Sequence, residues 1–164
     1  IYATGFDGVT GPYDRIDIRG KEGRCLKEEW TSFPRTLFGM QVDGYPNMLM
    51  ILGPHTARGN IPRNIEEVVE WQTDLISFMM DNEFDRVEPG SAAVDDWINT
   101  VSKASEGLLS SKIASWQTGV NRNVEGRSAP RVLGYNGGAV RYRKIISSVA
   151  TRHYQEFLFS QIGK

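Results

Sequence analysis

The chain has 164 residues, enough for about one domain with a sizeable hydrophobic core. Its net charge of −1 gives no support for nucleic-acid or membrane binding, and no apolar stretch approaches the ~20 residues of a membrane-spanning helix. The single cysteine, Cys25, excludes an intrachain disulfide and favours a cytoplasmic protein. One cysteine and two histidines cannot build a zinc site of the usual Cys/His kind.

The first part of the chain predicts two short strands. Residues 1–6 have a strand-like sequence and begin without Met, so we expect a fragment whose earlier part is missing. Gly5 would let this strand approach another group closely. Strict alternation over residues 15–19 predicts a half-exposed strand, with residues 24–26 pairing back as a hairpin. A single helical turn is expected at residues 27–30.

A strand, a loop and a helix are predicted at the centre of the chain. Residues 48–52 form a short, continuously apolar run, which is typical of a strand buried on both faces of a parallel sheet. The loop 53–59 contains two glycines, Asn60 is a good N-cap, and helical spacing predicts a helix over residues 61–81. Open α/β sheets bind ligands where a strand end faces such a helix N-terminus. An ordinary connection between a strand and a helix has the same pattern.

Two further helices and a long loop are predicted downstream. Ser91 is the expected N-cap of a helix that Gly107 ends. Residues 108–138 are expected to form a mobile loop, and a last helix is predicted at about 139–153. Core positions are predicted for three of the four tryptophans and four of the five methionines, namely Trp30, Trp71, Trp97, Met48, Met50, Met79 and Met80.

Charge is segregated along the sequence. Residues 66–96 contain ten acids and one base, whereas residues 119–154 contain seven bases and one acid. The favoured interpretation is two solvated faces of opposite sign that pair with each other. The alternative is that the basic segment binds a phosphate-bearing partner.

Two side chains stand out as candidate site residues. His55 could be a general base, but no serine or cysteine lies in a nucleophile-elbow setting, so we expect His55 to line a pocket. Trp116 lies in a polar, glycine-flanked loop and either anchors that loop or contacts the flat and polar groups of a ligand. The GxGxxG fingerprint and the P-loop motif are absent, so the chain holds no complete nucleotide site by its own motifs.

The chain resembles the flavin-dependent Baeyer–Villiger monooxygenases. The resemblance covers nearly the whole chain, and it rests on an ordered set of stretches: residues 3–7 (ATGFD), 14–20 (DRIDIRG), 53–66 (GPHTARGNIPRNIE) and 115–121 (SWQTGVN). It implies an α/β fold in which residues 1–164 form the C-terminal part of the FAD-binding domain, within a flavoprotein fold of two dinucleotide-binding domains. Strands and long helices would complete that domain. The implied reaction uses FAD and NADPH to insert one oxygen atom of O2 next to a ketone carbonyl, giving an ester or lactone.

The resemblance also implies roles for individual residues. Asn60 and Ile61 match the helix start whose backbone faces the flavin ring, where a helix N-terminus stabilises negative charge. Thr4 and Gly5 match the strand end near the cofactor, and Trp116 matches a tryptophan that contacts NADP in a mobile loop. That loop is expected to close when cofactor and substrate are bound.

The chain lacks several parts of the family pattern. Both glycine-rich fingerprints, the signature motif between them and the catalytic arginine are absent, and Arg58 cannot be given that arginine's role. We therefore expect no catalytic residue in this chain and no activity without its partner, the N-terminal remainder of the enzyme. The alternative is a non-catalytic nucleotide- or protein-binding domain that uses residues 119–154. A hydrolase using His55 is disfavoured, because no nucleophile is placed for it.

Overall fold

The computed structural model describes residues 8–162, so the strand expected at residues 1–6, with Thr4 and Gly5, lies outside the described residues. The described elements are, in chain order, η1 (Tyr13–Arg15), η2 (Lys21–Gly23), α1 (Leu26–Glu29), α2 (Ile61–Asp81), β1 (Arg86–Pro89), α3 (Ser91–Lys103), η3 (Leu109–Ser111), η4 (Trp116–Thr118), α4 (Ala139–Thr151) and β2 (Phe157–Ser160). No helix within residues 8–162 combines the length and the apolar character needed to cross a membrane.

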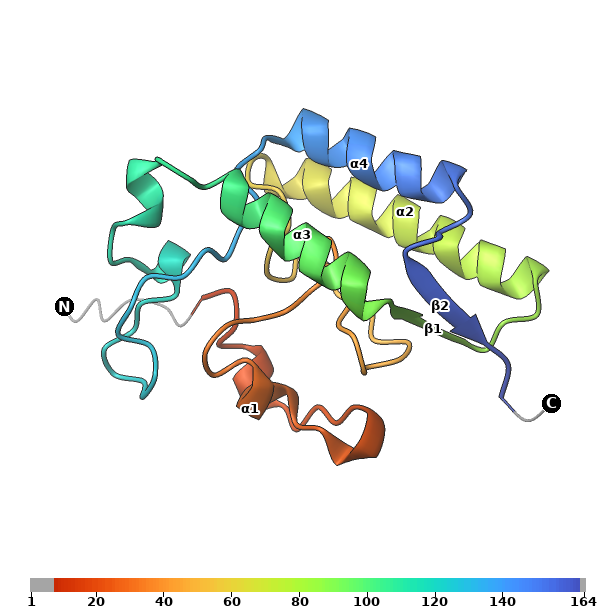
Figure 1. Cartoon of the computed structure of the whole chain (residues 1–164), viewed down its shortest axis with the longest axis horizontal. Coiled ribbons are helices and arrows are strands. Elements are labelled where there is room, and N and C mark those ends of the chain that lie inside the picture. Colours follow the sequence, from red (N-terminus) through yellow and green to blue (C-terminus); the bar gives the residue numbers. More distant parts are fainter. Residues whose placement is uncertain (1–7, 163–164) are drawn as a thin grey trace.

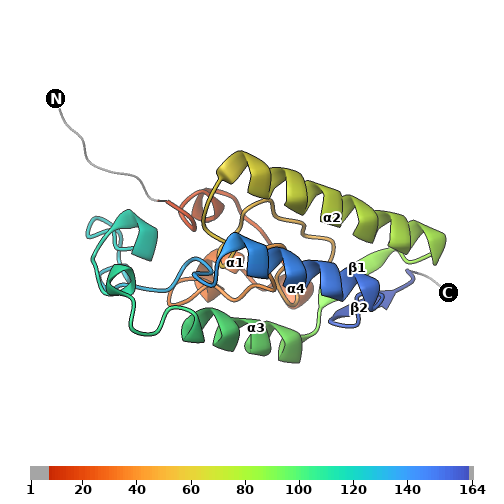
Figure 2. The same ribbon diagram turned by 90° about the horizontal axis from the view of Figure 1, so that it is seen from above.

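Three long helices form the body of the molecule. Figure 1 shows α2 and α4 side by side, and Figure 2 shows α4 between α2 and α3. The indole N–H of Trp71 on α2 donates a hydrogen bond to the Ile146 carbonyl of α4 at 2.8 Å, which joins the two helices. The antiparallel strands β1 and β2 pair at one end of this body, and residues 108–138 lie at the other end.

Helix α2 has the bounds that its local signals predict. The Asn60 side chain accepts a hydrogen bond from the Arg63 N–H at 3.1 Å, which caps the first turn. The buried face carries Val68, Trp71 and Leu75. The last turn ends at Asn82, whose backbone N–H donates to the Phe78 carbonyl. The prediction of a helix over residues 61–81 is confirmed.

Burial of aromatic side chains dominates the core. The Trp97 ring lies 5.0 Å from Phe38 and 5.0 Å from Tyr135, and the Trp71 ring lies 5.3 Å from Tyr154. The core positions predicted for the three tryptophans and for Met50 are confirmed, since each of these side chains is buried. Met48 and Met79 are partly buried against the core. The prediction for Met80 is wrong, because Met80 is 74% exposed.

The strand predicted at residues 48–52 is wrong. Asn47 and Leu52 both have left-handed backbone angles, with φ of 60° and 58°, and they interrupt an extended chain at either end of the run. The backbone groups of Met50 bond outside any ladder: its N–H donates to Met40, and its carbonyl accepts from the Gln72 side chain at 2.8 Å. The described residues therefore contain no parallel strand here, and their one sheet is the β1–β2 pair.

Other expectations are corrected in detail. The strand predicted at residues 15–19 is wrong, because η1 takes up its start and only the antiparallel bridge Arg19↔Cys25 remains of the hairpin. The helical turn expected at 27–30 is present as α1. Helix α3 begins after Gly90 without a side-chain cap and ends at Lys103, so neither Ser91 nor Gly107 has the role predicted for it. Helix α4 confirms the last predicted helix.

Candidate functional site

Three loop segments and the start of α2 surround a cavity of about 280 Å³. The segments are residues 53–59, 115–119 and 131–135, which we call the loop cluster. The cavity wall includes Ile61 at the start of α2 and Trp116 on η4. The structure therefore brings together two of the residues that the sequence identified from stretches far apart in the chain.

The start of α2 presents two free backbone donors. Among the first four N–H positions, Pro62 has none and the Arg63 N–H is capped by Asn60. The N–H groups of Asn60 and Ile61 make no hydrogen bond within the described part of the chain. Unpaired donors and the partial positive charge of a helix N-terminus favour an electron-rich ligand atom at this place.

Backbone hydrogen bonds fix the loop 53–59 beside the segment 131–135. The His55 N–H donates to the Leu133 carbonyl at 3.0 Å, and the Tyr135 N–H donates to the Thr56 carbonyl at 2.9 Å. Ala57 and Tyr135 form a parallel bridge, and the Asn64 side chain of α2 donates to the Ala57 carbonyl at 3.0 Å. The loop is thus attached on one side to a distant segment and on the other to the helix that follows it.

His55 is a structural residue at the back of this loop. Its side chain is 0% exposed and stacks on Phe33 with 5.2 Å between the ring centres. Burial lowers the pKa of His55 from 6.5 to about 4, so the ring is neutral at pH 7. Nε2 lies 3.1 Å from the Val132 carbonyl, which can only accept, so Nε2 carries the proton and Nδ1 faces the Thr36 hydroxyl. The expectation that His55 lines a pocket is wrong, because no part of it is accessible.

Trp116 is half-exposed at the edge of the cavity. It begins the short helix η4, which Gly119 ends with a left-handed φ of 70°. The ring lies against Gly8, since a Cβ at Gly8 would approach Trp116 Cε3 to 2.9 Å. The side chain is 51% exposed, so packing against Gly8 leaves much of the ring free to contact a ligand.

Arg58 is a site residue to which the sequence assigned no role. Its guanidinium donates to the Gln117 side-chain oxygen at 3.0 Å and to the Gln117 carbonyl at 3.1 Å. This pair links the loop before α2 directly to the turn that carries Trp116. The two residues are 59 positions apart in the chain, and no local pattern indicates the contact.

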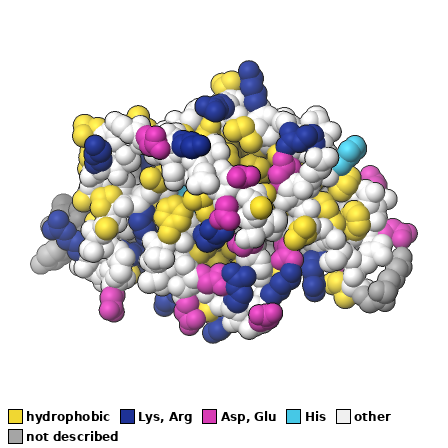
Figure 3. Space-filling model, in the orientation of Figure 1, with side chains coloured by type: hydrophobic (Ala, Val, Ile, Leu, Met, Phe, Trp, Pro, Cys, Tyr) yellow, Lys and Arg dark blue, Asp and Glu magenta, His cyan; other side chains and the backbone are white. Residues whose placement is uncertain are grey.

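An ion pair joins the acidic and the basic segment. Arg143 on α4 contacts Glu67 on α2 at 2.6 Å, as the favoured interpretation of the charge pattern predicts. Two more bases of residues 119–154 bind acids outside the acidic segment, Arg127 with Asp14 and Arg152 with Glu156. Figure 3 shows acidic and basic side chains interspersed over the visible face.

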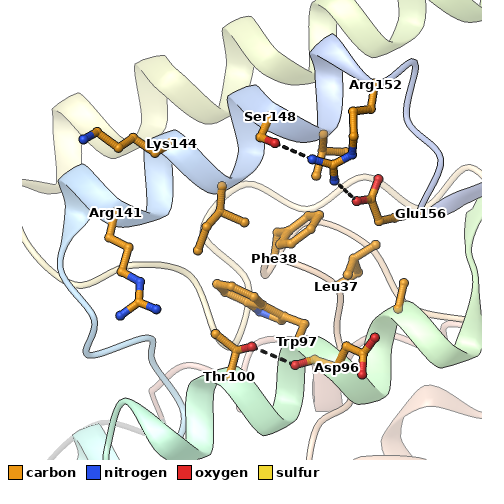
Figure 4. Close-up of a pocket in the computed structure, with 13 residues that line it drawn as sticks. Leu37, Phe38, Asp96, Trp97, Thr100, Arg141, Lys144, Ser148, Arg152 and Glu156 are labelled. Atoms are coloured by element: carbon orange, nitrogen blue, oxygen red, sulfur yellow. Dashed lines mark hydrogen bonds and ion pairs between the residues drawn. The ribbon is translucent and has the colours of Figure 1, made fainter.

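A second hollow lies between α3 and α4 and measures about 550 Å³ (Figure 4). Phe38 and Trp97 form its floor, and Arg141 and Lys144 extend from α4 at its rim. Of the residues assigned to cofactor binding, the three that the structure describes (Asn60, Ile61 and Trp116) do not line it. We therefore place the candidate cofactor site at the smaller cavity, where the identified residues converge.

No protein-family model matches the chain. It is 38% identical over 157 residues to cyclohexanone 1,2-monooxygenase of Acinetobacter sp, covering 96% of this chain and 28% of that protein. It is 37% identical over 158 residues to phenazine N-monooxygenase PhzNO1 of Lysobacter antibioticus, covering 96% and 29%. It is also 36% identical over 158 residues to a Baeyer–Villiger monooxygenase of Pseudooceanicola batsensis, covering 96% and 28%.

The fold is similar to a crystal structure of cyclohexanone monooxygenase from Rhodococcus sp. Phi1 bound to NADP+. The TM-score is 0.90 at 34% identity, over 97% of this chain and 29% of that one. The chain thus spans less than a third of the length of the proteins it matches. In sequence and in fold, the chain is similar to the Baeyer–Villiger and cyclohexanone monooxygenases, and it matches the C-terminal part of the cyclohexanone monooxygenase fold.

Proposed function

We propose that this chain is part of an FAD- and NADPH-dependent Baeyer–Villiger monooxygenase, which inserts one oxygen atom of O2 next to a ketone carbonyl. The observation that carries the proposal is the convergence of the α2 start and Trp116 on one cavity, in a chain 38% identical to cyclohexanone 1,2-monooxygenase. FAD would supply the redox chemistry, and NADPH the reducing equivalents.

The donors at the cavity and beside it suit a flat cofactor with an electron-rich edge. The Asn60 and Ile61 N–H groups would stabilise negative charge on the flavin ring. Trp116 would offer its ring face and indole N–H to the nicotinamide side. Leu52 and Leu133 add apolar wall, which excludes water from the reacting groups. Thr4 and Gly5 remain assigned to the cofactor by resemblance only.

We assign no catalytic residue to this chain, and we predict that it is inactive alone. The N-terminal remainder of the enzyme would bring the two glycine-rich fingerprints and the catalytic arginine. Substrate would be a ketone, with O2 as the second substrate.

A fusion protein tests the proposal. The chain replaces the matching part of Acinetobacter cyclohexanone 1,2-monooxygenase, and flavin absorbance, NADPH oxidation and product mass are measured with a panel of ketones and with a phenazine. We expect bound flavin and ketone-dependent ester or lactone formation by the fusion, and neither from the 164-residue chain alone. Ketone oxidation by the isolated chain, or N-oxidation alone by the fusion, would contradict the proposal.

A second candidate function is binding of a nucleotide or acidic protein through the basic segment 119–154. The hollow in Figure 4 favours it, because Arg141 and Lys144 stand over an aromatic floor. Titration with a nucleotide lacking nicotinamide, such as AMP, tests it by calorimetry. We expect binding that Arg141→Ala weakens if this function is present, and no heat of binding if it is not.

A further inference from the structure

We propose that Arg58 is a positioning residue that fixes the turn carrying Trp116 against the loop before α2, and so sets the width of the cofactor cavity. The effect on NADPH rests on the proposed function, whereas the effect on the turn does not. The two hydrogen bonds to Gln117, at 3.0 and 3.1 Å, carry the proposal.

The geometry of the contact fixes orientation as well as distance. One guanidinium nitrogen donates to the side-chain oxygen of Gln117, and the other donates to the carbonyl of the same residue. Two donors of a planar group that bind two acceptors on one residue leave that residue little freedom to rotate. Because Trp116 is the preceding residue, the backbone that carries its ring is positioned at the same time.

Arg58 is itself held in place by contacts of its backbone and of its side chain. Its backbone N–H donates to the Tyr135 carbonyl at 3.3 Å. The side chain then passes over Gly134, where a Cβ would lie 2.7 Å from Arg58 Nε and 3.2 Å from its Cγ. A larger residue at position 134 would displace the Arg58 side chain. A glycine at this position therefore allows that side chain to reach Gln117.

The far end of the turn has a separate attachment. The Arg131 N–H donates to the Thr118 carbonyl at 2.8 Å. Removing the Arg58 contact would therefore release the Trp116 end of the turn while the other end stays bound. The expected consequence is a wider and more variable cavity, without unfolding of the body.

The experiment uses the flavin-loaded enzyme that contains this chain, with Arg58→Ala, Arg58→Lys, Gln117→Ala and Gln117→Glu. Lys112→Ala is the matched control, because Lys112 lies in the same loop, is exposed and stands outside the basic segment 119–154. The rate of chymotrypsin cleavage after Trp116 measures how freely the turn moves. The KM and kcat for NADPH measure the effect on the cofactor cavity. Circular dichroism confirms folding.

We expect Arg58→Ala to raise both the cleavage rate and the KM for NADPH about fivefold, the factor for losing an exposed hydrogen-bonded pair, with kcat within about twofold. Gln117→Ala keeps the carbonyl acceptor, and Arg58→Lys keeps one donor point, so each should give an intermediate change. Gln117→Glu turns the contact into an ion pair between guanidinium and carboxylate and should slow cleavage below the parent rate. The control should match the parent.

The outcomes separate this inference from the proposed function. Faster cleavage in Arg58→Ala, with no ketone-dependent NADPH oxidation even in the parent, supports the positioning role and contradicts the proposed function. An active parent in which Arg58→Ala changes neither readout overturns the positioning role. If Arg58→Ala fails to fold, the two Gln117 variants provide the test. We expect faster cleavage in Gln117→Ala and slower cleavage in Gln117→Glu than in the parent. Equal cleavage rates in both variants would overturn the positioning role of Arg58.

Discussion

The helical body and the loop cluster are held together by different forces. In the body, α2, α3 and α4 bury large aromatic side chains such as Trp71, Trp97 and Tyr142. In the loop cluster, segments far apart in sequence are joined mainly by hydrogen bonds between backbone groups and a few polar side chains. We therefore expect substitutions in the body to change the free energy of unfolding, and many in the loop cluster to change the position of the site.

The largest effect is expected in the body, from Trp71→Ala. This side chain is buried, and its N–H bonds to the Ile146 carbonyl at 2.8 Å, so the variant leaves a cavity and an unpaired acceptor. We expect the free energy of unfolding to fall by about 3–5 kcal/mol. Urea unfolding measures it, with Trp116→Ala as the matched exposed tryptophan. A loss below about 1 kcal/mol would show that α2 and α4 do not depend on this contact.

His55 belongs to the loop cluster, but its buried side chain affects the free energy of unfolding, as the core residues of the body do. Its folded pKa of about 4 lies below the unfolded value of 6.5, so the unfolded chain binds more protons between these pH values. The stabilisation is complete above pH 6.5 and is lost as the pH falls toward 4, by about 3 kcal/mol in total. Urea unfolding at pH 7.5, 5.5 and 4.5 measures this slope.

Two substitutions isolate the contribution of His55 to the pH dependence of the free energy of unfolding. His55→Gln should reduce the pH dependence, because glutamine cannot be protonated. His153→Gln is the matched control, since His153 is exposed. An equal slope in the parent and in His55→Gln would mean that this imidazole does not control acid stability.

Gly39 and Gly23 have similar backbone conformations but different surroundings, since Gly39 is crowded and Gly23 is open. Both have a left-handed φ, of 72° and 75°. A Cβ at Gly39 would lie 2.3 Å from the Thr56 hydroxyl oxygen and 2.7 Å from the Thr56 backbone nitrogen, whereas Gly23 has nothing within 4 Å. We expect Gly39→Ala to lower the free energy of unfolding by about 1–3 kcal/mol more than Gly23→Ala. Equal losses would show that the loop 53–59 moves aside freely.

The smallest effect on stability is expected from Trp116→Ala. The ring is 51% exposed, so the free energy of unfolding should fall by less than about 1 kcal/mol. Under the proposed function, the KM for NADPH in the flavin-loaded enzyme should rise severalfold, because the ring contact to the nicotinamide side is lost. A large loss of stability with an unchanged KM would instead identify Trp116 as an anchor of its loop.

Local signals in the sequence predicted the body well. The cap at Asn60 and the helical spacing after it give the bounds of α2, because both act within a few residues. The apolar run at residues 48–52 was misleading, since its backbone bonds to Met40 and Gln72, which no local pattern reveals. The strands β1 and β2 were missed because four residues give too short a pattern, and their pairing joins segments about 70 positions apart.

The site was predictable only in part. The start of α2 and Trp116 were assigned to a site because they lie in motifs that resemble a known family, and the structure places Ile61 and Trp116 on one cavity. The contact between Arg58 and Gln117 could not be predicted, because hydrogen bonds across 59 residues depend on the folded path of the loops. The burial of His55 was equally hidden, since its partner Val132 lies 77 residues away.

The parallel bridge between Ala57 and Tyr135 determines which parts of the cavity can be altered by substitution. Its hydrogen bonds join peptide groups, which nearly every amino acid supplies, so the frame of the cavity does not depend on which side chains face inward. Leu133 faces the cavity while its carbonyl accepts from the His55 N–H. Any residue at position 133 keeps that carbonyl. The fold thus provides a fixed scaffold with an exchangeable lining, which under the proposed function is a starting point for altering substrate preference one side chain at a time.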